Sequence, residues 1–76
     1  MKLTMYAIKN KDRKYLRQEN PDVWVDTLPE VFKAKEPCLF LSLVDISPQD
    51  NDIVVEIEIE IAKVTEISEV SKDQFD

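Results

Sequence analysis

The chain has 76 residues, a formal net charge of −6, no histidine, no glycine and one cysteine. This length holds one domain with a single small core. Without histidine there is no imidazole base and no imidazole metal ligand, and without glycine there is no phosphate-cradling loop. The single Cys38 excludes an internal disulfide. We therefore expect a binding protein that is not an enzyme and that needs no cofactor or metal.

Charge is divided unevenly along the chain. Residues 1–35 carry eight basic and five acidic residues, a net charge of +3, whereas residues 36–76 carry two and eleven, a net charge of −9. This asymmetry indicates either charge pairing within the fold or two faces for different neighbours. No signal-peptide core is visible, and no stretch approaches the roughly 18 apolar residues of a membrane span, so we expect a cytoplasmic protein with no membrane contact.

The first part of the chain predicts three strands. Residues 3–9 alternate in side-chain character with a period of two, which is typical of a strand. The polar residues 10–14 suit a hairpin loop, after which residues 15–18 return as a second strand. Residues 23–25, Val-Trp-Val, predict a third strand, after a turn at Asn20-Pro21.

Turns that need a positive φ must use a residue other than glycine in this chain. Asparagine and aspartate are the next most tolerant residue types. The sequence therefore predicts that the positive-φ positions are among Asn10, Asp12, Asn20, Asn51 and Asp52.

The middle of the chain is compatible with either of two placements of a helix. Residues 27–30 have the spacing of a capping box, which predicts a short helix at 28–35 and makes residues 38–46 a buried strand. Alternatively the main helix covers residues 36–46, where a helical wheel separates Ser42 and Asp45 from the principal apolar face. A strand over the same residues would not achieve this separation. We therefore place the main helix at 36–46, and keep 28–35 as the alternative.

The clearest predicted element is a long strand over residues 53–61. Apolar side chains alternate there with carboxylates, so one face should be buried and the other exposed. The pattern can extend through Val64. Residues 66–76 are polar, and we expect them to fray as a tail beyond a single domain at residues 1–65. The order strand, strand, helix, strand predicts an α+β fold, with one helix packed on the apolar face of a small antiparallel sheet.

Several stretches of the chain stand out together: the opening MYAIKNKDRKYL, the tryptophan in DVWVD, FKAKEP and the closing DIVVEIEIEI. They resemble a type of small protein encoded by bacteriophages and prophages of Firmicutes, over most of residues 5–61. Members usually carry glycine in the hairpin, where this chain has Arg13. Some members lie among genes that counter host defences, including anti-CRISPR loci. The resemblance implies a phage accessory protein that acts in the host cytoplasm by binding.

Carboxylates form the first candidate site. Same-face residues of a strand repeat every ~6.6–6.8 Å, close to the phosphate spacing along a nucleic-acid strand. A row of this kind could imitate a DNA backbone in the groove of a nuclease or regulator, or could be an ordinary solvent-facing strand surface. The candidate partner-binding residues are Glu56, Glu58, Glu60, Asp50 and Asp52.

Basic residues crowd the first hairpin and form a second candidate site. They resemble a small phosphate-binding patch, or alternatively a solvated hairpin tip that neutralises the acidic half. Because the net charge is negative, nucleic acid is not expected as the main partner. The residues of this patch are Lys9, Lys11, Arg13, Lys14 and Arg17.

These observations lead to two functional hypotheses. The first is a small phage-type protein that inhibits a host protein, such as a defence or CRISPR nuclease or another DNA-binding protein, by acidic mimicry of nucleic acid. The second is a phage structural or assembly accessory, or a homo-oligomeric interaction module whose bipolar charge drives self-association.

Overall fold

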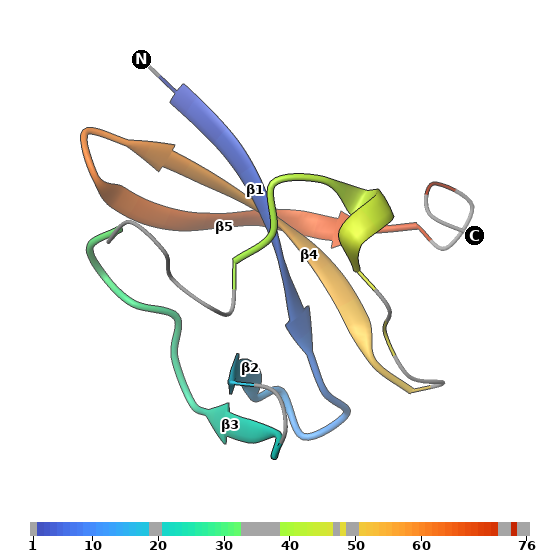
Figure 1. Ribbon diagram of the computed structural model, residues 1–76. Coiled ribbons are helices and arrows are strands. Elements are labelled where there is room, and N and C mark those ends of the chain that lie inside the picture. The colour runs from blue at the N-terminus through green and yellow to red at the C-terminus, as the bar shows by residue number, and fades with distance from the viewer. Residues whose placement is uncertain are drawn as a thin grey trace.

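The computed structural model describes residues 2–18, 21–32, 39–46, 48, 51–71 and 74. These ranges form strands and one 3₁₀ helix (Figure 1): β1 (Lys2–Lys9), β2 (Tyr15–Gln18), β3 (Val23–Val25), η1 (Leu43–Asp45), β4 (Ile53–Glu60) and β5 (Lys63–Val70). The three strands expected in the first part of the chain are confirmed. The long acidic strand, β4, is confirmed as far as Glu60.

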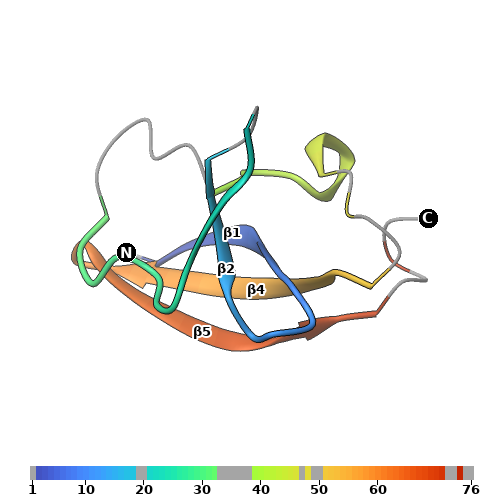
Figure 2. The ribbon, with the colours of Figure 1, turned by 90° about the horizontal axis from the view of Figure 1, so that it is seen from below.

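All five strands belong to one sheet, in the order β3-β2-β1-β4-β5, with antiparallel neighbours. β1 and β4 form the centre, where pairing runs without interruption from Lys2↔Glu60 to Lys9↔Ile53. Figure 2 shows that β4 and β5 bend along their length, so the sheet is curled like part of a barrel.

The second edge of β1 is shared by two partners. β2 pairs with β1 only at Lys9↔Tyr15, after which β2 and β3 diverge as their own hairpin. Further along β1, Phe40 forms an isolated bridge with Tyr6, in which the two residues exchange hydrogen bonds of 2.8 Å. Unpaired backbone groups are costly to bury, so Phe40 satisfies a part of β1 that β2 leaves unpaired.

The centre of the sheet has two faces, because successive strand residues point to opposite sides. The side to which Met5, Ala7, Val55, Ile57 and Ile59 point is called the Ile57 face below, and it carries one core cluster together with Leu39. The opposite side, called the Glu58 face, carries the second cluster: Ile8, Leu16, Ile46 and Val54. Adjacent residues Val54 and Val55 are only 1 % and 0 % exposed, so the beginning of β4 is covered on both faces.

The expected α+β fold, with a helix at 36–46 on the apolar face of the sheet, is wrong. Residues 36–38 lie outside the described residues, and residues 39–46 contain the Phe40 bridge and the three-residue helix η1. The segment lies at the edge of β1 and supplies both cores, since Leu39 packs in the Ile57-face cluster and Ile46 in the other. Its apolar residues therefore did not need to share one helical face.

The alternative helix at 28–35 is not present in its described part. Residues 28–32 contain no α-helix, and Val31 forms an antiparallel bridge with Lys63 at the start of β5. Residues 33–35 lie outside the described residues. The sheet is therefore the dominant structure in the part of the chain that can be described.

Two boundaries also differ from expectation. The strand does not continue from Glu60 to Val64, because the chain reverses at residues 61–62 and returns as β5. Residues 66–70, expected to belong to a frayed tail, are part of β5 and pair with β4. The sheet domain therefore extends at least to Val70.

Among the described residues, the positive φ angles do not fall on asparagine or aspartate. They occur at Arg13 (64°), Ile61 (49°) and Ala62 (67°), whereas Asn20 lies outside the described residues. Asn10 instead supports the first turn with its side chain, which accepts hydrogen bonds from the N–H groups of Asp12 (2.9 Å) and Lys14 (3.0 Å).

Candidate functional site

Glu56, Glu58 and Glu60 lie in one row on the Glu58 face, as their alternation predicts. β4 is central in the sheet, so each carboxylate has a residue of β1 on one side and a residue of β5 on the other. The three rows are Tyr6–Glu56–Ser68, Thr4–Glu58–Thr65 and Lys2–Glu60–Lys63. The result is a polar strip over three strands, with lysines only at the Glu60 end.

The carboxylates at the Glu60 end are partly neutralised. Lys2 Nζ lies 3.6 Å from Glu58 Oε1 and 3.9 Å from Glu60 Oε2. The side chain of Lys2 is 62 % exposed, and such exposed ion pairs contribute only about 0–1 kcal/mol to stability. Lys2 therefore lowers the charge of the row without being fixed there, and a partner surface can displace it.

The aspartates do not complete the row. Asp50 lies outside the described residues. Asp52 precedes β4 at the end remote from Glu60, is half-buried and already has an interaction of its own. Between Asp52 and Glu56, the same face is occupied by the buried Val54, beneath the second core cluster. The structure therefore brings together three of the five acidic candidates.

The basic candidates are also separated. Lys11, Arg13 and Lys14 are exposed in the β1–β2 turn, where Lys14 Nζ lies 3.8 Å from an Asp26 carboxylate oxygen. Arg17 is half-buried in β2 and has an interaction of its own. Lys9 is only 7 % exposed and points to the Ile57 face. The exposed remainder is a hairpin tip with three cations, one of them paired.

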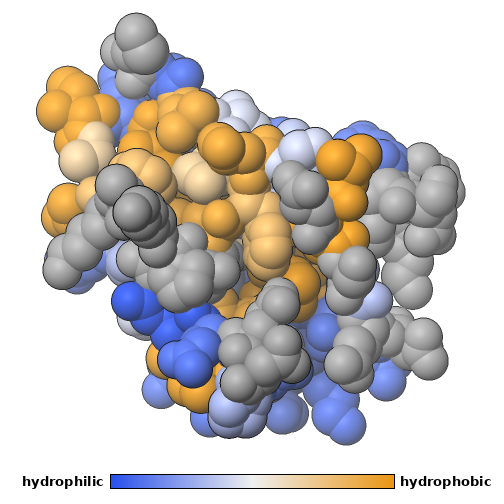
Figure 3. Space-filling model, in the orientation of Figure 1, coloured by the Kyte–Doolittle hydropathy of each residue, from blue (hydrophilic) through white to orange (hydrophobic). Residues whose placement is uncertain are grey.

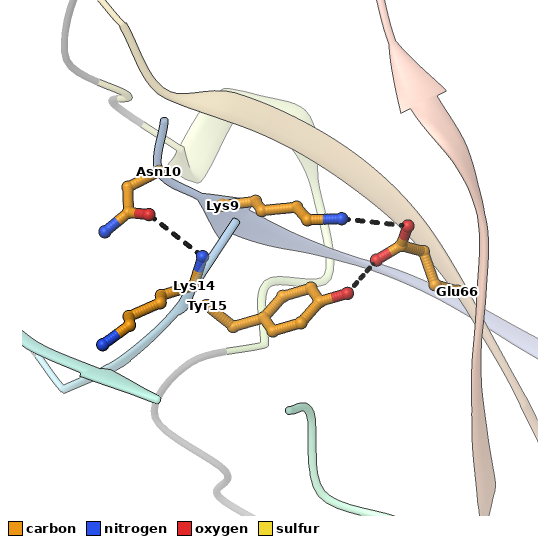
Figure 4. Close-up of polar contacts among 5 residues, drawn as sticks. All are labelled: Lys9, Asn10, Lys14, Tyr15 and Glu66. Atoms are coloured by element: carbon orange, nitrogen blue, oxygen red, sulfur yellow. Dashed lines mark hydrogen bonds and ion pairs between the residues drawn. The ribbon is translucent and has the colours of Figure 1, made fainter. Parts of the chain in front are cut away.

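Lys9 belongs instead to a polar cluster with Tyr15 and Glu66 (Figure 4). The Tyr15 hydroxyl donates a hydrogen bond to Oε1 of Glu66, while Lys9 Nζ lies 3.5 Å from Oε2 of the same carboxylate. The ammonium group also lies 5.1 Å from the centre of the Tyr15 ring. We call these three residues the latch, because they connect β1 and β2 to β5, which is not adjacent to either strand in the sheet.

Within the latch, Tyr15 holds its phenolic proton tightly, because its pKa is raised. Burial is the largest cause that raises the pKa of Tyr15 from 10.0 to about 12, and the hydrogen bond and charge of Glu66 act in the same direction. Arg13 opposes this rise with its positive charge. A phenol with a raised pKa is a hydrogen-bond donor at neutral pH and a poor nucleophile. The latch is therefore a structural contact between strands.

Sequence reasoning missed the latch, although one signal was available. Lys9 is in phase with Met5 and Ala7 in the period-two pattern, so its side chain had to share their buried face. Because the sequence predicts Glu66 in a frayed tail, it offers no carboxylate in the sheet as a partner for Lys9. The charge of Lys9 suggested exposure, but the aliphatic stem of a lysine can lie in a core while its ammonium reaches a carboxylate.

A metal site finds no support in the described ranges. No group of three or more His, Cys, Asp or Glu residues within them is arranged to hold a metal ion. Cys38 lies outside these ranges. A search of the same residues for a helix long and apolar enough to cross a membrane found none.

Comparison with known proteins assigns no relative to this chain. No family model, no curated protein and no solved structure matches it. The geometry of the sheet and its side chains is therefore the basis for a functional proposal.

Proposed function

We propose that the chain is a small phage-type binding protein that inhibits a host protein in the cytoplasm by presenting its acidic strand in place of nucleic acid. The observation that carries the proposal is the row Glu56, Glu58 and Glu60, with all three carboxylates on one face of the central strand. A basic nucleic-acid groove, as found in nucleases and DNA-binding proteins, is the partner that this charge fits.

The surroundings of the row support a contact surface. The neighbouring strands contribute the small side chains Thr4, Thr65 and Ser68, while Tyr6 flanks Glu56, which is half-buried. The side chains of Glu58 and Glu60 are 34 % and 52 % exposed. Strand geometry spaces the carboxylates at ~6.6–6.8 Å on a semi-rigid backbone. The face therefore offers a preordered line of negative charge, for which a flexible acidic tail would need costly ordering.

The test begins with a partner. The protein is used to capture proteins from a Firmicutes lysate, with and without nuclease treatment, and the purified partner is titrated with the triple variant Glu56→Gln, Glu58→Gln, Glu60→Gln. We expect the affinity to fall at least tenfold at low salt, and the salt dependence to weaken, because charge complementarity governs such encounters. Nucleic acid should compete with the unaltered protein for the same partner.

A matched control separates the row from the net charge. The variant Asp12→Asn, Asp22→Asn, Asp26→Asn also removes three negative charges, but from exposed positions outside β4. We expect it to bind nearly as well as the unaltered protein. Equal losses in the two triple variants would show that only net charge matters. Unchanged binding by the glutamine variant at both salt concentrations would exclude the mimicry mechanism.

The rival proposal, an assembly accessory or homo-oligomeric module, is favoured by a separate surface. Apolar side chains gather in Figure 3 near the end of the molecule where β4 turns into β5. At this end Leu3, Val31 and Ile61 are 41 %, 55 % and 89 % exposed. Sedimentation velocity over a wide concentration range tests the rival. A dimer that dissociates on Ile61→Thr substitution would support the homo-oligomeric module, and a monomer at all concentrations would exclude it.

A further inference from the structure

β5 is an edge strand, and its outer edge is only partly used by the described residues. Residues 30–32 bond to its beginning, where Val64 N–H donates to the Glu30 carbonyl (3.1 Å) and Phe32 N–H donates to the Ala62 carbonyl (2.6 Å). Among the described residues, Val64 is the last residue of β5 that this segment bonds at the outer edge. Figure 2 shows β5 at the outer margin of the sheet.

The pairing determines which backbone groups of β5 point outward. Val64 N–H points away from β4, since it bonds to Glu30. Alternate residues of an antiparallel strand repeat this direction, so the backbone groups of Glu66 also point outward. Beyond the bulge, Glu69 pairs with Val55, two residues from the partner of Glu66, and its backbone groups therefore point outward too.

We propose that the edge of β5 from Thr65 to Val70 is a site where an extended, basic segment of a partner protein adds as a further strand. These six residues match the usual length of a strand. Main-chain hydrogen bonds to an exposed edge supply affinity in this mode, and side chains supply specificity. Ile67, the extra residue of the bulge, is 49 % exposed and offers an apolar contact to the added strand.

Charge decides the nature of the occupant. Residues 64–70 contain Glu66 and Glu69 and no basic residue. The Glu66 carboxylate is already paired with Lys9 in the latch, so Glu69 is the carboxylate of this edge that an added strand can pair with. A second copy of the chain would set these glutamates against an equally acidic edge, and like charges in directly opposed positions destabilise strand pairs. Lysine or arginine in the added strand would reverse the sign of that interaction. This edge does not include Glu56, Glu58 or Glu60, so the proposal does not depend on nucleic-acid mimicry.

The experiment uses two synthetic peptides of equal length, one alternating threonine with lysine and the other alternating threonine with glutamate. Each is titrated into the full chain while backbone amide signals are followed by nuclear magnetic resonance. We expect the lysine peptide to shift the amides of Glu66 and Glu69 and to protect them from hydrogen exchange. The glutamate peptide should bind at least about tenfold more weakly, because opposite-charge pairs are worth up to about 1 kcal/mol each.

Variants separate backbone pairing from charge. Glu69→Pro removes an outward N–H without breaking the ladder to β4, and should abolish binding beyond Glu66, whereas Glu69→Gln keeps that N–H and should weaken binding by at most about fivefold. A lysine peptide methylated on every amide should fail to bind the unaltered chain, because both of its edges lack N–H donors, and this result does not depend on the folding of any variant. The triple glutamine variant of β4 should keep the amide shifts, which distinguishes this site from the Glu58 face.

Three results would overturn the proposal. The first is equal binding of the two peptides. The second is a set of shifts confined to Glu56 and Glu58. The third is protection of Glu66 and Glu69 that increases with protein concentration in the absence of peptide, which would identify a second copy as the occupant.

Discussion

The two hairpins of the sheet combine turn and ladder in opposite ways. In the β1–β2 turn, the side chain of Asn10 accepts two backbone hydrogen bonds that stabilise the turn. The ladder between β1 and β2 nevertheless consists of the single pair Lys9↔Tyr15. The β4–β5 turn places Ile61 and Ala62 at positive φ, which is unfavourable for a β-branched residue, yet its ladder runs to the pair Val54↔Val70.

This difference shows that turn chemistry alone does not decide which hairpin holds. A two-residue turn with positive φ at both positions is a type I′ turn, for which Asn-Gly is the favoured sequence. The β4–β5 hairpin tolerates Ile-Ala because the Ile57 face of β4 lies in a core cluster. The β1–β2 hairpin has little ladder, and β2 is attached to the rest of the sheet by the latch and by Leu16 in the second core cluster. Four substitutions test this account.

The largest effect is expected where the ladder meets the core. Ile57 is fully buried, so Ile57→Ala should lower the free energy of unfolding by about 2–5 kcal/mol, the range for removing a large aliphatic side chain from a core. Urea denaturation followed by tryptophan fluorescence measures the change. Ile67→Ala, at an exposed position on the same hairpin, is the control and should cost less than about 1 kcal/mol. Similar losses would mean that packing does not hold this hairpin.

The second effect is a gain at the unsupported turn. Replacing Ile61-Ala62 with Asn-Gly should raise the free energy of unfolding by about 1–3 kcal/mol, because it relieves backbone strain at positive φ. The side chain of Ile61 is 89 % exposed, so little packing is lost. The control Ile61→Thr keeps a β-branched residue at the strained position and should bring no gain. If the free energy of unfolding also rises in the threonine variant, the gain comes from removing the exposed apolar side chain of Ile61 and not from relief of backbone strain.

Much of the sheet was predictable from alternation, and the exceptions have physical causes. β1 to β4 begin or end within a residue of their predicted bounds because each has a clear periodicity or strong turn signals. β5 was missed because Ile61-Ala62 has no turn signal and the strand itself is polar. Residues 39–46 were misassigned because a segment at a sheet edge can supply two cores, and its apolar pattern then resembles a helix.

The candidate site was predicted in its centre and not at its margins. Period-two alternation correctly placed Glu56, Glu58 and Glu60 on one face, since only local geometry was needed. Asp52 failed to join them because residues distant in sequence cover Val54. Such coverage depends on tertiary packing, which no local pattern encodes. The same applies to the latch, whose members come from three strands.

The third effect tests the latch. Tyr15→Phe should lower the free energy of unfolding by about 1–2 kcal/mol at neutral pH, since the hydroxyl donates to a carboxylate. The pKa of Tyr15 is raised from 10.0 to about 12 in the folded state, so its contribution is present below pH 10 and is lost as the pH rises through 12. The variant should therefore lose less stability than the unaltered protein over this interval. Denaturation at the two ends of this interval measures the difference. If the free energy of unfolding falls equally in the variant and in the unaltered protein, the role of Tyr15 is contradicted.

The smallest effect concerns Arg13 in the supported turn. Arg13 holds a φ of 64°, the conformation that glycine adopts without penalty. Arg13→Gly should raise the free energy of unfolding by only about 0.5–1 kcal/mol, because relief at one residue is offset by the greater freedom of glycine in the unfolded chain. Asn10 keeps its two hydrogen bonds in either case.

The same substitution has a second, independent consequence. The positive charge of Arg13 lowers the pKa of Tyr15, so its removal should raise that pKa further, and tyrosinate absorbance should develop at higher pH. Arg13→Lys keeps both the charge and the strained φ, and should change neither the stability nor the titration. A gain in stability without a shift in the titration would mean that the turn and the latch are uncoupled. A shift in both would show that the β1–β2 turn, although its own ladder is short, adjusts the contact that attaches β2 to β5.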